Sequence, residues 1–247
     1  MKINRLHCFK AYDIRGKLGS EFNEDIAFKI GYAATIRLKA KKVVVGYDAR
    51  ESSTNLFNAV AQGICFAGGE VLSLGLAGTE EVYSAVTFFE SDAGISITAS
   101  HNPIDYNGMK IVKSGPRPLS ENEFSDIKSI AEKYDKKNFQ SNLRIVDKQY
   151  EARSYFIKKI VSFVDVSKLK PLKILVNSGN GAAGPTFDML DKFLRDHGVQ
   201  TNFIRMHHNP DPNFPNGIPN PLLIGNRKIT ADAVIKENAD FVDNFFI

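Results

Sequence analysis

Short apolar segments alternate along this chain with segments of helical periodicity. An apolar run over 41–46 reads as a buried strand, and a second run over 71–74 follows it. Between them Leu56 and Val60 recur on one helical face, with Ser53 as the expected N-cap of that helix. Strands separated by helices favour an α/β architecture. This alternation continues through most of the chain.

The strand–helix–strand pattern occurs twice. The first unit, residues 45–69, runs from the end of one strand to the end of its helix, and the second, 176–198, has nearly the same length. This similarity indicates either one module used twice or the ordinary spacing of any α/β protein. A polar segment over 136–147 separates the two units as a linker or an edge element. We therefore predict two similar mixed-sheet α/β domains, over 1–140 and 150–247.

Two loops of the second half are rich in glycine, asparagine and proline. The turn at 177–184 matches neither common glycine-rich nucleotide motif, so we expect a tight strand-to-helix connection rather than a nucleotide site. The segment 209–217 is expected to be an irregular loop of fixed geometry, because its prolines lack N–H donors and its asparagines suit turns.

Charge, cysteine content and the length of apolar stretches limit the partners and the compartment that we expect for this chain. The formal net charge is +4, and the 32 basic residues are dispersed among 28 acidic ones, which argues against nucleic-acid binding and suits a small acidic ligand. The cysteines, Cys8 and Cys65, lack the spacing of a metal or redox site and predict a reducing compartment. Because no stretch has the length of a signal peptide core or a membrane span, we expect a cytoplasmic protein without a membrane partner.

One loop carries the strongest chemical signal. The strand-like residues 94–99 lead into Ser100, His101, Asn102 and Pro103, and the proline keeps this segment from becoming a helix. Such a loop displays the serine hydroxyl beside an imidazole and amide groups, where it can carry a transferable group. A polar turn after a strand is the alternative interpretation of the tetrapeptide taken alone.

The extended string 98–110 resembles the active-site serine loop of the phosphohexomutases, the phosphomannomutase and phosphoglucomutase superfamily. Residues 9–16 (Phe-Lys-Ala-Tyr-Asp-Ile-Arg-Gly) and 46–50 (Gly-Tyr-Asp-Ala-Arg) resemble two further signatures of this family. The segments 177–184 and 211–220 are similar to landmarks of its second domain. The resemblance covers about residues 7–240.

The resemblance implies a phosphate shuttle. Ser100 would be phosphorylated and would exchange its phosphoryl group with a hexose phosphate substrate, which turns around between two transfers. Arg15 and Lys110 would lie near the transferring phosphate, with Lys110 or His101 assisting proton transfer. Tyr12 would line the sugar pocket. Outside these motifs each side chain would more simply be a surface, turn or half-buried residue.

The resemblance also implies Mg²⁺, held in the family by one phosphoserine oxygen and three aspartates of a D-G-D-x-D-R loop. Ser100 could supply the phosphoryl oxygen, but the aspartate loop is absent from this sequence, and Asp240 and Asp243 do not reproduce its spacing. The third and fourth family domains are missing as well. We therefore expect a truncated, N-terminal half of a phosphohexomutase, with little activity alone.

The wording of 78–83 (Gly-Thr-Glu-Glu-Val-Tyr) is similar to the bacterial phosphomannomutases that feed GDP-mannose synthesis. This implies interconversion of mannose 6-phosphate and mannose 1-phosphate. Two alternatives stay open: a phosphoglucomutase or phosphoglucosamine mutase, and a non-catalytic module that binds sugar phosphates or assists assembly. The sequence leaves the oligomeric state open.

Overall fold

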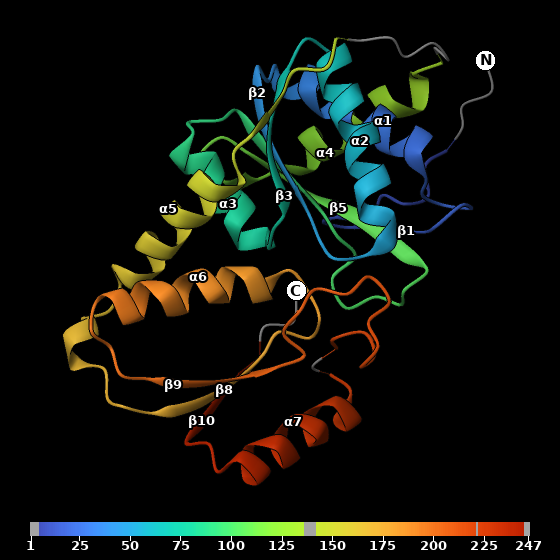
Figure 1. Cartoon of the computed structure of the whole chain (residues 1–247). Coiled ribbons are helices and arrows are strands. Elements are labelled where there is room, and N and C mark those ends of the chain that lie inside the picture. Colours follow the sequence, from blue (N-terminus) through green and yellow to red (C-terminus); the bar gives the residue numbers. More distant parts are fainter. Residues whose placement is uncertain (1–4, 136–141, 221, 245–247) are drawn as a thin grey trace. The chain divides into compact units, whose positions relative to one another are not determined.

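The computed structural model describes residues 5–135, 142–220 and 222–244. The chain divides into two compact units, one of residues 1–99 and 104–152 and one of residues 100–103 and 153–247. Figure 1 shows an α/β arrangement in each unit. The two-domain α/β class expected from the sequence is confirmed. Part of the expected linker, 136–141, and the last three residues of the chain lie outside the described residues.

A seven-stranded mixed sheet forms the centre of the first unit. Its order is β1-β5-β4-β2-β3-β7, and β6 pairs with β5. Strands β2, β3, β4 and β7 pair in parallel, whereas β5 runs antiparallel to its neighbours. The bounds are β1 Ile14–Lys17, β2 Lys42–Tyr47, β3 Glu70–Leu76, β4 Ala93–Ile97, β5 Tyr106–Lys113, β6 Arg117–Pro118 and β7 Ile145–Asp147. Strand β7 therefore makes the end of the polar segment 136–147 an edge element.

Helices cover both faces of this sheet (Figure 1). Helices α1 (Glu24–Leu38), α2 (Glu51–Phe66) and α4 (Glu121–Lys133) cover one face, and α3 (Thr79–Phe88) covers the other. Consecutive residues of β2 alternate between the two cores: Val43 and Val45 belong to the larger, Val44 to the smaller. All three are at most 1% exposed, as a parallel strand buried on both faces requires.

Two serines near helix starts have different roles. Ser120 caps α4, where its hydroxyl accepts from the N–H of Glu123 and the Glu123 carboxylate accepts from the N–H of Ser120. The expectation that Ser53 caps α2 is wrong. Helix α2 begins at Glu51, and the Ser53 hydroxyl instead donates to Asp48 Oδ1 at 2.6 Å. Ser53 therefore lies inside the first turn of α2, where its hydroxyl accepts from Asn107 Nδ2 rather than from the helix end.

The second unit is built around a three-stranded parallel sheet with the order β10-β8-β9. Its elements are β8 Lys173–Asn177, α6 Ala183–Asp196, β9 Asn202–Met206, α7 Ile224–Glu237 and β10 Phe241–Asn244. Figure 1 shows α6 and α7 on opposite sides of this sheet. Helix α5, Gln149–Val161, begins in the first unit, and the short helix η1, Val166–Lys168, follows it. Within the described residues, no helix combines the length and apolarity that crossing a membrane requires.

Both strand–helix–strand modules expected from the sequence are present as β2-α2-β3 and β8-α6-β9, each with parallel strands. The glycine-rich turn at 177–184 is a tight strand-to-helix connection, as predicted. Gly179 and Asn180 adopt positive φ values of 58° and 57° there, and the N–H of Gly179 donates to Asn177 Oδ1. The chain thus reverses direction within a few residues.

Candidate active site

The serine loop joins two antiparallel strands. It leaves β4 after Ile97 and enters β5 at Tyr106. Ser100 has a φ of +54°, the left-handed region that few non-glycine residues adopt. Such a conformation costs free energy and persists only where the surrounding structure imposes it. The loop therefore holds Ser100 in an imposed geometry rather than in a relaxed turn.

Backbone hydrogen bonds fix the residues that lead into Ser100. Ile97 O accepts from the N–H of Asp48 at 3.0 Å, and the N–H of Thr98 donates to Gly108 O at 3.0 Å. The guanidinium of Arg15 donates through NH1 to Ala99 O at 3.2 Å, and its Nε lies 2.7 Å from Asp13 Oδ2. One of the predicted cations thus binds the peptide carbonyl immediately before the serine.

Arg15 and Lys110 lie on the same face of the sheet. Arg15 faces Gly108 across the β1–β5 pair, and Lys110 is two residues further along β5, so both side chains project to one side. Lys110 in turn faces Ser96, whose hydroxyl lies 3.2 Å from the hydroxyl of Thr79, the first residue of α3. Two basic side chains therefore gather on the α3 face, beside the base of the serine loop.

His101 and Tyr12 are the more exposed of the predicted site residues. His101 Nδ1 lies 3.3 Å from Ser100 Oγ, within reach of a hydrogen bond between the two side chains. Tyr12 lies in the turn before β1 and is 94% exposed. The structure thus pairs His101 with Ser100, while the predicted role of Tyr12 in a sugar pocket stays a prediction.

A buried polar network around Asp48 joins residues whose pairing was not predicted from the sequence. Asp48 Oδ1 accepts from the N–H of Arg50 and from Ser53 Oγ, and Asp48 Oδ2 lies 3.3 Å from Arg50 Nε. Asn107 donates to the Ser53 hydroxyl at 2.9 Å, and Arg50 NH1 donates to Tyr106 O at 3.1 Å. The network ties the start of β5 to the end of β2.

Burial sets the electrostatics of this network. The Arg50 side chain is only 2% exposed. Its burial lowers the pKa of the guanidinium, and the Asp48 carboxylate opposes that shift. The string 46–50 resembles a family signature, and its aspartate and arginine, two residues apart at the end of a buried strand, could have indicated an ion pair. The pairing with the distant Asn107 could not be predicted from the sequence.

The described residues do not fit a magnesium site. Among them there is no group of three or more His, Cys, Asp or Glu side chains placed to share a metal ion. Asp240 accepts from the N–H of Lys173 at 2.8 Å, a structural role at the start of β10, and Asp243 pairs with Val176 along the sheet. A hard cation needs several oxygen ligands around one point, and these two carboxylates do not provide them.

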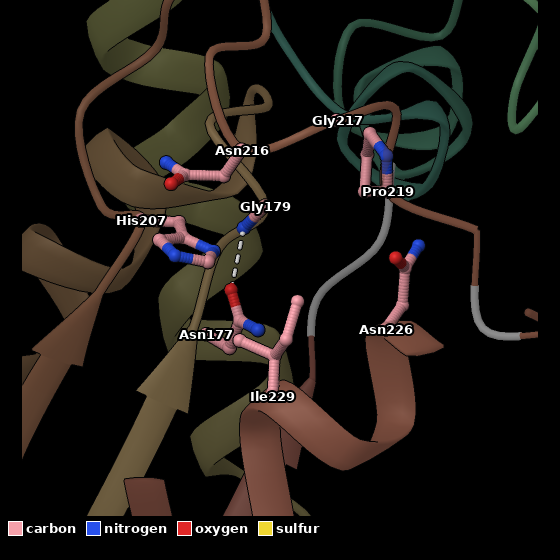
Figure 2. A pocket seen from close by; sticks show the side chains of 8 residues that line it. All are labelled: Asn177, Gly179, His207, Asn216, Gly217, Pro219, Asn226 and Ile229. Carbon is pink, nitrogen blue, oxygen red and sulfur yellow. Dashed lines mark hydrogen bonds between the residues drawn. The ribbon is translucent and has the colours of Figure 1, made fainter. Parts of the chain in front are cut away.

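A small polar pocket lies at the carboxyl edge of the β8–β9–β10 sheet (Figure 2). Amide side chains line it, and they are engaged within the protein: Asn177 with Gly179 and Thr230, Asn226 with the carbonyls of Ile218 and Asn220. Burial lowers the pKa of the remaining titratable group, His207. The pocket is lined by Asn177, Gly179, His207, Asn216, Gly217, Pro219, Asn226 and Ile229. These hydrogen bonds fix the segments that line the pocket. Its lining contains no lysine or arginine that could bind a phosphate.

The fold and the serine loop define a class, the multidomain α/β phosphohexomutases. Residues 7–138 match the family model of phosphoglucomutase/phosphomannomutase alpha/beta/alpha domain I. Residues 154–245 match the model of alpha/beta/alpha domain II. The chain therefore belongs to the phosphoglucomutase/phosphomannomutase family, as its motifs indicated.

Curated relatives and solved structures agree with this assignment. The chain is 47% identical to a "Phosphomannomutase" of Salmonella montevideo and 46% identical to one of Escherichia coli K12, in each case over 96% of this chain and 52% of the relative. A "Phosphoglucomutase/phosphomannomutase family protein" structure from Burkholderia thailandensis matches with a TM-score of 0.78 at 30% identity, over 94% of this chain and 50% of that one. A putative phosphomannomutase from Thermus thermophilus shares the fold, with a TM-score of 0.82 at 22% identity, over 96% of this chain and 54% of that one. The chain spans about half the length of these relatives and corresponds to their N-terminal half.

Proposed function

We propose that this chain is the phosphoserine-bearing part of a phosphomannomutase-type intramolecular phosphotransferase, which interconverts mannose 6-phosphate and mannose 1-phosphate. The observation that carries the proposal is the imposed geometry of Ser100, in the left-handed region at a loop whose preceding carbonyl binds Arg15. The names of the curated relatives support the choice of sugar.

The transfer proceeds in two balanced steps. In the first, the bond between the phosphorus and Ser100 Oγ breaks as a hydroxyl oxygen of the hexose phosphate bonds to the phosphorus. A base takes the proton of that hydroxyl, and Ser100 Oγ takes up a proton as it leaves. The sugar, now carrying two phosphates, turns around. In the second step the other phosphoryl group of the sugar passes to Ser100 Oγ, which gives its proton to a base, and the sugar oxygen that the phosphoryl group leaves takes up a proton.

The predicted site residues have separate roles in this scheme. Arg15 and Lys110 place positive charge on the α3 face of the sheet, where they stabilise the charge of the phosphoryl oxygens during transfer. His101, 3.3 Å from Ser100 Oγ, or Lys110 holds and returns the proton. Tyr12, which is exposed in the turn before β1, would contact the sugar ring.

Magnesium is expected of the family, with a phosphoryl oxygen on Ser100 as one ligand. Because the described carboxylates do not gather around one point, we assign no step of this chain to the metal. We also assign no residue to the sugar hydroxyls or to the second phosphate of the substrate, since the chain spans about half of its curated relatives. We expect the 247 residues alone to turn over hexose phosphates weakly or not at all.

The test is to locate the phosphate. The chain is incubated with a hexose 1,6-bisphosphate, and its intact mass and phosphopeptide map are measured. We expect one phosphoryl group on Ser100 and none on the Ser100→Ala variant, with Ser96→Ala as a matched control that keeps the modification. A chain that stays unphosphorylated would favour the non-catalytic sugar-phosphate module instead.

A different sugar is the second candidate. The relative from Burkholderia thailandensis is described by both sugars of the family name, and a relative from Xanthomonas campestris that is 42% identical is named "Phosphohexose mutases". These names favour a broader specificity that includes glucose phosphates. The cytoplasmic location and the absence of nucleic-acid and membrane partners stay predictions.

A further inference from the structure

Arg50 occupies a position that its local structure disfavours. It is the N-cap of α2, where serine, threonine, aspartate and asparagine are preferred because their side chains accept from the first helical N–H groups. A cation there also meets the positive end of the helix dipole, and the Arg50 side chain is only 2% exposed. A buried arginine at such a position indicates a role in contacts other than those of the helix.

The side chain of Arg50 reaches the strand at which the serine loop ends. Its NH1 donates to Tyr106 O, in the first residue of β5, at 3.1 Å, while its Nε lies 3.3 Å from Asp48 Oδ2. A planar guanidinium can hold two acceptors at once, because its N–H groups point in fixed, separate directions. Arg50 therefore joins its countercharge, directly after β2, to the backbone at the end of the loop.

The same segment holds the other end of the serine loop. The N–H of Asp48 donates to Ile97 O, in the last residue of β4, at 3.0 Å. Residues 98–105 thus connect two carbonyls, Ile97 O and Tyr106 O, that are bound by residues only two positions apart in the sequence. A loop fixed in this way at both ends has few backbone conformations available to it.

Arg50 lies near the serine loop but away from solvent. Its burial is the main cause of its lowered pKa, and the positive charge of Arg15 adds to that shift. The two guanidinium groups therefore lie within electrostatic range of each other, and Arg15 binds Ala99 O, directly before Ser100. Ser100 keeps its φ of +54° only while the surrounding structure imposes it. Fixing both ends of the loop is one way to impose it.

We infer that Arg50 is a positioning residue for phosphoryl transfer at Ser100. Its guanidinium fixes Tyr106 O and, together with the Asp48 N–H on Ile97 O, keeps the loop in the conformation that directs Ser100 Oγ toward the phosphorus. Transfer is sensitive to a misplacement on the order of 1 Å. A loop released at one end therefore transfers phosphate more slowly while the sugar bisphosphate still binds. This inference rests on the proposed function.

The test compares variants of the full 247-residue chain. Arg50→Lys keeps the charge but has one ammonium group in place of the guanidinium fork. The double variant Asp48→Asn/Arg50→Met removes both charges, so that no unpaired charge stays buried, and either variant that folds is sufficient. The controls Ile64→Val and Ile64→Ala truncate a fully buried side chain of the same helix, about 20 Å along it from Arg50. They lower stability without changing the loop.

Phosphate uptake is the first measurement. The uptake at Ser100 from a hexose 1,6-bisphosphate is followed by intact mass in single turnovers, at several concentrations of the bisphosphate and at a temperature where every variant is folded. We expect the maximal rate to fall at least tenfold in both Arg50 variants, with the half-saturating concentration changed less than twofold. The Ile64 variants should keep the rate of the native chain.

Amide exchange is the second measurement and does not depend on phosphate uptake. The N–H groups of Thr98 and Leu18 donate to carbonyls of β5 and of the loop, at 3.0 and 2.8 Å. Both amides should exchange at least fivefold faster in the Arg50 variants than in the Ile64 variants. Exchange at Glu70, whose N–H donates to a carbonyl directly before β2, should not differ between them.

Two results overturn the inference. One is phosphate uptake that is as fast in the Arg50 variants as in the Ile64 variants. The other is exchange at Thr98 and Leu18 that has the same rate in all of them. A native chain that takes up no phosphate contradicts the proposed function instead, and the amide exchange then decides whether Arg50 holds the loop.

Discussion

Removing the carboxylate of Asp48 tests whether the buried network holds the base of the serine loop. In Asp48→Ala the guanidinium of Arg50, 2% exposed, loses its countercharge, and the Ser53 hydroxyl and Arg50 N–H lose their acceptor. Breaking a buried ion pair from one side costs about 3–5 kcal/mol. Because the Asp48 side chain is 11% exposed and water can partly replace it, we expect about 3 kcal/mol, at the low end.

The assay is urea unfolding followed by circular dichroism, since the chain has no tryptophan. With a denaturant dependence of about 1–3 kcal/mol/M, the midpoint should fall by about 1–3 M. Amide exchange resolved by peptide assigns the loss to β2 and α2 of the first unit. Asp48→Asn should lose less, because it keeps an acceptor for Ser53.

The control is Asp126→Ala, which removes a shorter pair, 2.7 Å to Arg37 Nε, with side chains that are 34% and 53% exposed. Such exposed pairs contribute about 0–1 kcal/mol. If Asp48→Ala lowers the midpoint no more than Asp126→Ala, burial does not strengthen this network and the reasoning is refuted.

Three further outcomes are expected. The hydrogen bonds from Lys113 hold the pKa of Glu123 at about 2, below its ordinary 4.5, so its contribution to folding stability is complete above pH 4.5 and lost as the pH falls through 2. The difference in unfolding free energy between the native chain and Glu123→Gln, measured by urea titration at each pH, should shrink over that range. A constant difference would contradict this. Gly108→Ala places a methyl group against a carbonyl of β1 and should lower the unfolding free energy by about 1–3 kcal/mol in urea. The control Gly225→Ala places its methyl group in open space and should be neutral or slightly stabilising. Equal losses in the two variants would exclude the clash as the cause. Burial raises the pKa of the Cys8 thiol to about 11, so a thiol reagent should label it only after unfolding, and rapid labelling of the native chain would contradict its buried position.

Much of the fold could be predicted because its signals are local. The alternation of strands and helices needs only neighbouring residues, and it is confirmed. The assignment of Ser53 to a helix cap failed because α2 begins two residues earlier, at Glu51. Within the first turn the Ser53 hydroxyl donates to Asp48 and accepts from Asn107, a residue far away in the sequence.

The candidate site divides in the same way. Ser100 and His101 are adjacent in sequence, and a motif could find them together. The contact of Arg15 with Ala99 O joins residues far apart in the chain, and the network through Asn107 does so as well. Sequence patterns name such residues singly, whereas the pairing of strands brings them together.

The hydrogen bond from Arg15 to the carbonyl of Ala99 bears on the phosphorylated and unphosphorylated forms of the loop. Its acceptor is a main-chain atom, which is the same in both forms. Phosphorylation and dephosphorylation of Ser100 would then alter the local charge while leaving the backbone of the loop unchanged. In crystal structures of the two forms the backbone of residues 97–106 should superimpose, and no backbone rearrangement would be needed between turnovers.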